Sequence, residues 1–174
     1  MARGSKTAKA VEGYFSRLSI LRSTGGATHE TSYYSVLEGL LNAIGSDLAP
    51  KVFCLSQLAD QGAGHPDFGL FAAGQCQKGE PKPGQLPERG VVEVKGTGED
   101  AWFAADTWQV SKYWERYRLV LVTNYRDFLL IGEDTHGRVV SLEGFRLANT
   151  EIEFWSRLQT PRRYAQEIGD RFAE

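Results

Sequence analysis

Three side chains that together could hydrolyse a phosphodiester bond lie in two short segments, GHPDFGLF at residues 64–71 and GVVEVKG at residues 90–96. The first segment carries Asp67, and the second carries Glu93 and Lys95. Mg²⁺ prefers oxygen ligands and keeps several of its waters, so one or two carboxylates plus substrate phosphate oxygens are enough to hold it. We therefore expect Asp67 and Glu93 to bind the metal. Lys95 is expected to orient or help deprotonate the attacking water and to offset negative charge that develops in the transition state.

The second segment predicts a strand whose alternation places its two charged groups together. Successive side chains of an extended chain point to opposite faces, so Glu93 and Lys95 share one face. Val92 and Val94 occupy the other face, and the main-chain carbonyl of Val94 is a candidate third metal ligand. A glutamate and a lysine at this spacing also form a common solvated ion pair, so the pair points to catalysis only in combination with Asp67.

A further acidic site residue is expected on the helix predicted for residues 29–44. Glu30 extends the apolar stripe of this helix by one turn, and a carboxylate at the end of a buried face is costly unless it has a partner. We therefore take Glu30 as a candidate catalytic residue, although the helix dipole alone also favours an acid there. Glu38, one position off the stripe, is the alternative candidate for this role. If it has no such role, we expect it to be a solvent-exposed residue on the flank of the helix.

The helix predicted to begin near Ala105 carries Gln109 and Tyr113, which lie on one face because they are four residues apart. An amide and a phenol there could bond a phosphate or the waters near a metal, so Gln109 is a candidate catalytic residue and Tyr113 a candidate substrate-binding residue. The alternative is a surface glutamine and a core tyrosine. His65 is interpreted as a turn residue without a role.

The composition is that of an ordinary soluble domain, with 174 residues, 41% hydrophobic and 24% charged. Cys54 and Cys76 lack metal-ligand spacing, so reduced thiols are expected. No apolar run reaches the length of a membrane span and the first residues lack the apolar part of a secretory signal, so a cytoplasmic protein without membrane contact is the default expectation. The formal net charge is −2, whereas freestanding DNA-binding proteins usually carry a basic excess, so we expect a partner to supply part of any grip on DNA.

Periodicity and turn residues predict a single mixed α/β domain. Helices are predicted over residues 7–22, 29–44, 106–117, 150–158 and 161–172, after a polar lead at residues 1–6. Strands are predicted over residues 51–55, 68–72, 90–96, 118–123, 128–132 and 138–142. The polar loop at residues 74–89 is expected either to reach along a substrate or to be a plain flexible hairpin. The core order is helix, three strands, helix, strand, with a catalytic core over residues 28–142 and additional helices on either side.

In order and spacing, Glu30, Pro66-Asp67, Glu93-x-Lys95 and Gln109-x-x-x-Tyr113 resemble the PD-(D/E)xK nuclease superfamily. More narrowly, ETSYY, QGAGHPDFGLF, ERGVVEVKG, QVSKYW and LVLVTNYRDFLLIG resemble the N-terminal nuclease region of type IIG and type ISP restriction-modification proteins. In those proteins an N6-adenine DNA methylase follows the nuclease. The resemblance covers roughly residues 28–158.

This resemblance implies a restriction-endonuclease-like fold, a mixed central sheet flanked by helices, and Mg²⁺-dependent cleavage of DNA, with Mn²⁺ as a substitute. It also implies a methylase and target-recognition domain or subunit as the partner that chooses the site. The sequence has no Asn-Pro-Pro-Tyr-type methylase motif and no P-loop motif, so a split-off cleavage module is expected. Three questions stay open: whether the fold only docks on DNA or a partner, whether it acts on RNA or in repair, and whether a transient dimer cuts both strands.

Overall fold

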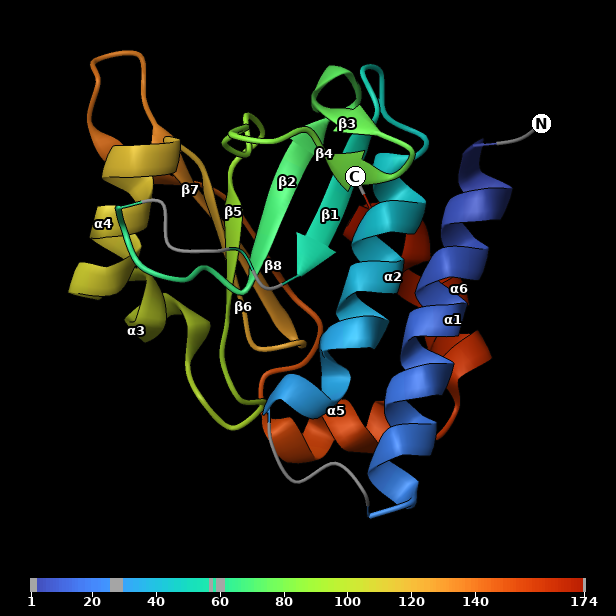
Figure 1. Ribbon diagram of the computed structural model, residues 1–174. Coiled ribbons are helices and arrows are strands. Elements are labelled where there is room, and N and C mark those ends of the chain that lie inside the picture. The colour runs from blue at the N-terminus through green and yellow to red at the C-terminus, as the bar shows by residue number, and fades with distance from the viewer. Residues whose placement is uncertain (1–2, 26–29, 57, 59–61, 174) are drawn as a thin grey trace.

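The computed structural model describes residues 3–25, 30–56, 58 and 62–173. Figure 1 shows a central sheet with helices on both faces. The helices are α1 (Arg3–Ser23), η1 (Glu30–Tyr33, 3-10), α2 (Tyr34–Gly45), η2 (Ala73–Gln75, 3-10), α3 (Ala101–Ala105), α4 (Trp108–Tyr117), α5 (Glu151–Arg157) and α6 (Pro161–Ala173). The strands are β1 (Val52–Ser56), β2 (Phe68–Ala72), β3 (Cys76–Gln77), β4 (Glu80–Pro81), β5 (Val91–Val94), β6 (Val120–Thr123), β7 (Asp127–Glu133) and β8 (Val139–Arg146).

Six strands form one sheet in the order β1-β2-β5-β6-β7-β8, and β3 and β4 form a separate two-stranded hairpin. Among the strands that the structure describes, only β5 and β6 pair in parallel, and α3 and α4 form the crossover between them. The other four pairings in the large sheet are antiparallel. The sheet is therefore mixed and mostly antiparallel, and the predicted core order of helix, three strands, helix, strand is confirmed by α2, β1, β2, β5, α4 and β6.

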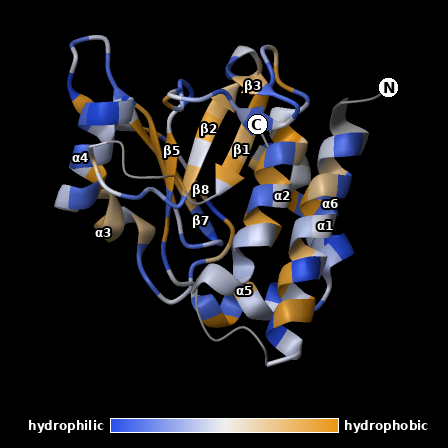
Figure 2. Ribbon diagram, in the orientation of Figure 1, coloured by the Kyte–Doolittle hydropathy of each residue, from blue (hydrophilic) through white to orange (hydrophobic). Residues whose placement is uncertain are grey.

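Apolar side chains form two cores, one on each face of the sheet. Helices α1, α2, α5 and α6 enclose the larger core, and α3 and α4 enclose the smaller one (Figure 1). Val92 and Val94 of β5 belong to the larger core, whereas Val91 belongs to the smaller one. The alternation predicted for this strand is confirmed, and it places Glu93 on the face covered by α3 and α4. Figure 2 shows the hydrophobic residues concentrated along β1 and β2, with mixed hydropathy along α1 and α2.

Strand β1 is an edge of the sheet, and side chains of α2 cover its outer side. Asn42 pairs with both main-chain groups of Cys54, donating from Nδ2 to the carbonyl at 2.8 Å and accepting from the N–H at 2.9 Å. Glu38, one turn earlier, accepts a hydrogen bond from the Ser56 N–H at 3.0 Å. These contacts satisfy groups that an open edge would expose. They also place the N-terminal end of α2 at the end of the sheet where β2 begins.

Two predicted helices start in different places from those expected. Of the polar lead expected at residues 1–6, residues 3–6 already belong to α1, which begins at Arg3. The helix predicted from residue 29 begins as the 3-10 turn η1 and becomes α-helical only at Tyr34, while His29 lies outside the described residues. Both cysteines are free thiols, as expected.

The helix expected to begin near Ala105 is confirmed as α4, but a separate short helix that was not predicted, α3, precedes it. The Asp100 carboxylate accepts hydrogen bonds from the N–H groups of Trp102 and Phe103 at 2.8 and 3.2 Å, which starts α3 at residue 101. Thr107 is the N-cap residue of α4. Its hydroxyl donates to the Ala104 carbonyl at 2.7 Å and does not cap the N–H groups of α4.

The polar segment at residues 74–89 contains the β3–β4 hairpin and is organised by Gln75, which is 8% exposed. The Gln75 side chain accepts hydrogen bonds from the N–H groups of Ala72 and Glu88, and donates one to the Leu86 carbonyl at 2.6 Å. The segment follows the last residue of β2, whereas Asp67 precedes the first. The hairpin therefore lies at the opposite end of β2 from Asp67, which favours the hairpin interpretation over a substrate-contacting loop. Within the described ranges, no helix combines the length and apolar character needed to span a membrane.

Candidate active site

The carboxylate of Asp67 is held by two donors from different parts of the chain. Its Oδ2 accepts a hydrogen bond from the Val94 N–H of β5 at 2.7 Å, and its Oδ1 accepts one from the hydroxyl of Tyr34, the first residue of α2. The Tyr34 ring packs against Phe68, with ring centroids 5.1 Å apart. Because both donors come from packed elements, the orientation of the Asp67 carboxylate is fixed before any ligand arrives.

Glu93 and Lys95 form a close ion pair at the end of β5. The Lys95 ammonium lies 2.7 Å from Oε1 of Glu93. The Lys95 side chain is 23% exposed and the Glu93 side chain 5% exposed. The position of Lys95 is also fixed by its main-chain N–H, which donates to the Thr123 carbonyl of β6 at 2.8 Å. A carboxylate buried this deeply is screened little by water, so its charge acts strongly on a nearby ion.

Strand register brings Asp67 next to this pair. Phe68 pairs with Val92 in the antiparallel contact between β2 and β5, and continuing the register by one residue sets Asp67 opposite Glu93. Directly opposite residues of an antiparallel pair have Cα atoms about 4.5–5.5 Å apart. The hydrogen bond from Val94 to Asp67 agrees with this placement.

The hydroxyl of Tyr113 lies close enough to Asp67, Glu93 and Lys95 for all three charges to shift its pKa. Burial is the largest cause of its raised pKa; the hydrogen bond from Gln109 lowers the pKa, Glu93 and then Asp67 raise it, and Lys95 lowers it. Tyr113 is 1% exposed, and its hydroxyl accepts a hydrogen bond from Nε2 of the exposed Gln109 at 3.0 Å. The two residues therefore share one face of α4, as predicted, and that face is turned toward the carboxylates.

The two glutamates proposed for the helix before β1 differ in what the structure describes. Glu30 begins η1, at the site end of the sheet, but its side chain lies outside the described residues. Glu38 lies one turn beyond Tyr34 and holds the edge of β1 through Ser56, as described above. Glu38 therefore has a structural contact, whereas the role expected for Glu30 stays a prediction.

The donor set fits a hard cation with few protein ligands. In the part of the chain that the structure describes, no three His, Cys, Asp or Glu side chains gather as a metal cluster. The site instead offers the carboxylates of Asp67 and Glu93. The Val94 carbonyl lies on the same edge of β5 as the N–H that bonds Asp67, because both groups of one strand residue point the same way. Two carboxylates and a carbonyl suit Mg²⁺ or Mn²⁺, which keep waters and take substrate oxygens, rather than a four-ligand zinc centre.

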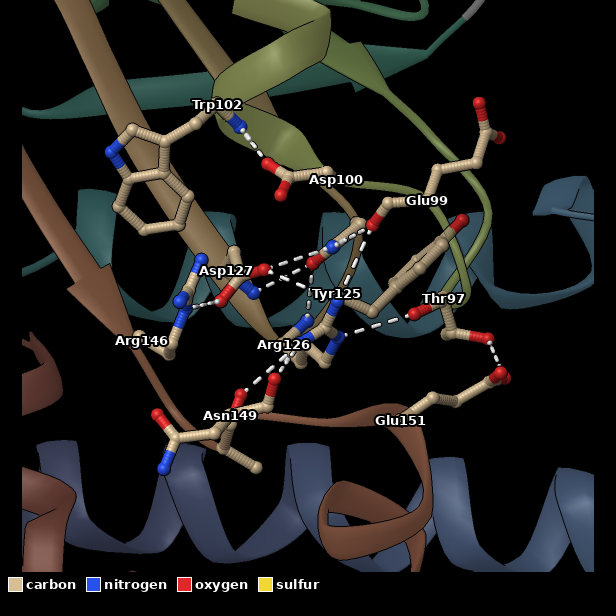
Figure 3. A network of polar contacts seen from close by, with 12 residues as sticks. Thr97, Glu99, Asp100, Trp102, Tyr125, Arg126, Asp127, Arg146, Asn149 and Glu151 are labelled. Atoms are coloured by element: carbon tan, nitrogen blue, oxygen red, sulfur yellow. Dashed lines mark hydrogen bonds and ion pairs between the residues drawn. The ribbon is translucent and has the colours of Figure 1, made fainter.

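A buried polar network fixes the loop that follows Lys95 (Figure 3). Arg126, 7% exposed, donates to the carbonyls of Thr97, Ala148 and Asn149 at 3.1–3.2 Å. Asn124, which is fully buried, donates to the Glu99 carbonyl at 2.6 Å. These bonds hold the loop between β5 and α3 against the turn between β6 and β7. The segment that follows Lys95 is therefore fixed in position.

Sequence reasoning missed the contacts of Tyr34 and the network around Arg126. Helical spacing places Tyr34 in the apolar stripe of its helix and by itself indicates only core packing. The signal that could have found its role is the spacing: it lies four residues after Glu30 and therefore shares a face with that candidate acid. For Arg126, no local signal existed, because a turn arginine is ordinarily solvated.

No family model matches the sequence, and no curated protein matches it. Among solved structures, a chain in a cryo-electron-microscopy structure of a DrdV–DNA complex is similar, with a TM-score of 0.58 and 14% sequence identity. The match covers 89% of this chain and 96% of that chain. At this identity the likeness shows a shared fold.

Proposed function

We propose that this chain is a Mg²⁺-dependent DNA endonuclease domain of the PD-(D/E)xK type, with the restriction-endonuclease-like fold. Target choice would be supplied by the methylase and target-recognition part of a restriction-modification system. The observation that carries the proposal is the convergence of Asp67, Glu93 and Lys95 at neighbouring ends of β2 and β5. The fold shared with a chain of a DNA complex is consistent with DNA as the substrate.

Each residue has a task in phosphodiester hydrolysis that follows from its contacts. Asp67 and Glu93, with the Val94 carbonyl, would hold the cation; when bound, Mg²⁺ supplies Lewis-acid polarisation of the phosphate and lowers the pKa of a coordinated water. Asp67 needs no reorganisation, because Tyr34 and Val94 already orient it. Such preorganisation is the main source of electrostatic stabilisation in a transition state.

The amine and the amide act on the substrate side of the site. Lys95 would orient the attacking water and offset the negative charge that develops on the phosphate oxygens, and the buried Glu93 keeps its ammonium in place. Gln109 is exposed, and its amide is oriented by the Tyr113 hydroxyl, so it is suited to hydrogen-bond a phosphate oxygen or a water.

Two measurements test this proposal. Calorimetric titration with Mn²⁺ is expected to show binding by the wild-type chain and a loss of affinity in Asp67→Asn, with the turn variant Asp134→Asn as the matched control. Plasmid nicking with Mg²⁺ or Mn²⁺ at high protein concentration is expected for wild type and for Lys112→Ala, but not for Lys95→Ala. Equal nicking by wild type and Lys95→Ala would remove the role of Lys95. A wild-type chain that binds neither cation would instead favour a non-catalytic docking domain.

A further inference from the structure

Arg146, the last residue of β8, lies in a surface groove of roughly 390 Å³ lined by Asp100, Trp102, Gly144 and Arg146 itself. Its Nε donates to Oδ1 of the fully buried Asp127 at 2.9 Å. Its guanidinium carbon lies 4.3 Å from the centroid of the Trp102 ring. Figure 3 shows the arginine beside the Asp127 carboxylate, with the Trp102 ring above it. A planar cation held by a buried carboxylate and an aromatic face has little rotamer freedom left to lose on binding.

The outer edge of this guanidinium is available to a ligand. The Arg146 side chain is 39% exposed, and within the described ranges neither of its Nη groups donates a hydrogen bond. Asp127 does not need those groups, since Asn124 donates to its other oxygen at 3.0 Å. The Asp100 carboxylate in the same groove already accepts the two N–H groups that cap α3.

The groove is built by a glycine. A Cβ at Gly144 would lie 3.3 Å from the Trp102 ring and 3.1 Å from a methyl of Leu129, tighter than ordinary contacts. A side chain at this position would press on the indole beside Arg146, so the glycine favours their close packing. The ring in turn supports the guanidinium, so the groove depends on Gly144 and Trp102 together.

Arg146 lies on the same face and at the same end of the sheet as the candidate active site. Arg146 lies opposite Asp127 in the pairing of β7 and β8, so their side chains share a face. Successive strand residues point to opposite faces, so Asp127 points away from the larger core, which holds Phe128, and toward the smaller core, which holds Leu129. Glu93 faces that side as well. Three strand spacings separate β5 from β8, and the register sets Arg146 level with Lys95, about 14 Å from it across the sheet. A separation of this size spans only a few nucleotides of one DNA strand.

We propose that Arg146 binds a backbone phosphate of the DNA substrate a few nucleotides from the reacting bond; this inference rests on the proposed function. The fork of two Nη groups matches the two free oxygens of a phosphodiester. Because a chain with a net charge of −2 lacks an overall basic excess, individual fixed cations such as this one are suited to position the backbone.

The test is a binding titration without chemistry. A short fluorescein-labelled duplex is titrated with the protein in EDTA at several salt concentrations, and affinity is measured by anisotropy. Arg146→Gln is expected to weaken binding about 5–10-fold and to lower the slope of log affinity against log salt by about one. Arg138→Gln is the matched control. It also pairs with an aspartate, Asp134, at 2.7 Å, but lies on the turn at the other end of β7 and β8, so binding is expected to stay at the wild-type level.

Arginine modification provides a second measurement that needs no variant. Wild-type protein is treated with phenylglyoxal with and without the duplex, and modified peptides are quantified by mass spectrometry. DNA is expected to protect Arg146 and to leave Arg138 reactive. Equal protection of both residues, no protection of Arg146, or an unchanged affinity of a folded Arg146→Gln would each overturn the phosphate site. A chain that binds DNA through Arg146 but never nicks it would leave this site intact and refute the nuclease proposal alone.

Discussion

The hydroxyl of Tyr34 donates a hydrogen bond to Oδ1 of Asp67, so the first residue of α2 orients a carboxylate at the start of β2. The two residues are 33 positions apart in sequence. Their contact depends on α2 lying along β1, where Asn42 and Glu38 bond the edge of the strand. A helix on the larger core thereby controls a side chain of the candidate active site.

Removing this hydroxyl is expected to weaken metal binding without unfolding the protein. In Tyr34→Phe the ring can still pack against Phe68, but Oδ1 of Asp67 loses its donor. Outer-shell partners of metal ligands typically contribute 10–100-fold to affinity, so we expect about a 10-fold rise in the Kd for Mn²⁺ by calorimetry. Tyr33→Phe is the control, because it also removes one tyrosine hydroxyl, but from a ring that packs against Tyr125 with centroids 5.3 Å apart. Unchanged Mn²⁺ affinity in Tyr34→Phe would show that Val94 alone orients the carboxylate.

Divalent cations are expected to stabilise the fold through Glu93. A ligand at 100 times its Kd stabilises the native state by about 2.7 kcal/mol, so Mn²⁺ should raise the Tm of the wild-type chain in a thermal melt. Glu93→Gln should abolish this rise, because it removes a buried carboxylate of the proposed pair. Glu143→Gln, on the exposed strand β8, should keep the wild-type response. A rise of the same size in all three proteins would locate the cation elsewhere.

Gly90 is expected to be essential for the parallel contact between β5 and β6. Its φ is +99°, and a Cβ there would overlap the carbonyl oxygen of Leu119. Gly84 also has a positive φ, +73°, but a Cβ would meet nothing within 4 Å. Gly84→Ala should therefore cost about 1 kcal/mol of unfolding free energy, and Gly90→Ala about 3 kcal/mol, because close packing adds to the backbone strain. Urea denaturation measures both; equal losses would contradict the close approach to Leu119.

Glu151 is expected to make stability depend on acid pH. Its carboxylate accepts hydrogen bonds from Thr97 at 2.6 Å and from Trp155 at 3.1 Å. The Thr97 bond is the main cause of its lowered pKa, with Trp155, Arg22 and Arg126 lowering the pKa further against desolvation. A lowered folded pKa means that the carboxylate stabilises the fold above its unfolded pKa, about 4.3, and that this contribution is lost as pH falls through the folded value.

Glu151→Gln should therefore reduce the unfolding free energy at pH 7 by about 1 kcal/mol, since an amide replaces a charged acceptor. The difference from wild type should shrink toward zero in urea melts at pH 3. A difference of the same size at both pH values would show that shape rather than charge matters at this position.

The element pattern was predictable from sequence because local geometry repeats along the chain. Strand alternation placed Val92 and Val94 opposite Val91 in β5, and helical spacing placed Gln109 and Tyr113 together. Helix boundaries were less predictable. They depend on caps such as Asp100, whose carboxylate starts α3, a short helix that periodicity did not predict.

By itself the sequence determined which residues could serve the chemistry and which side of its strand or helix each occupies, because periods of two and of 3.6 residues are properties of the backbone. Only the tertiary structure decided that Tyr34 orients Asp67, that Lys95 pairs with a buried Glu93, and that Asp127 fixes Arg146 on the same face. These contacts depend on strand order and on how α2 and α3 lie against the sheet. Such long-range packing is set by the whole core, and no local pattern encodes it.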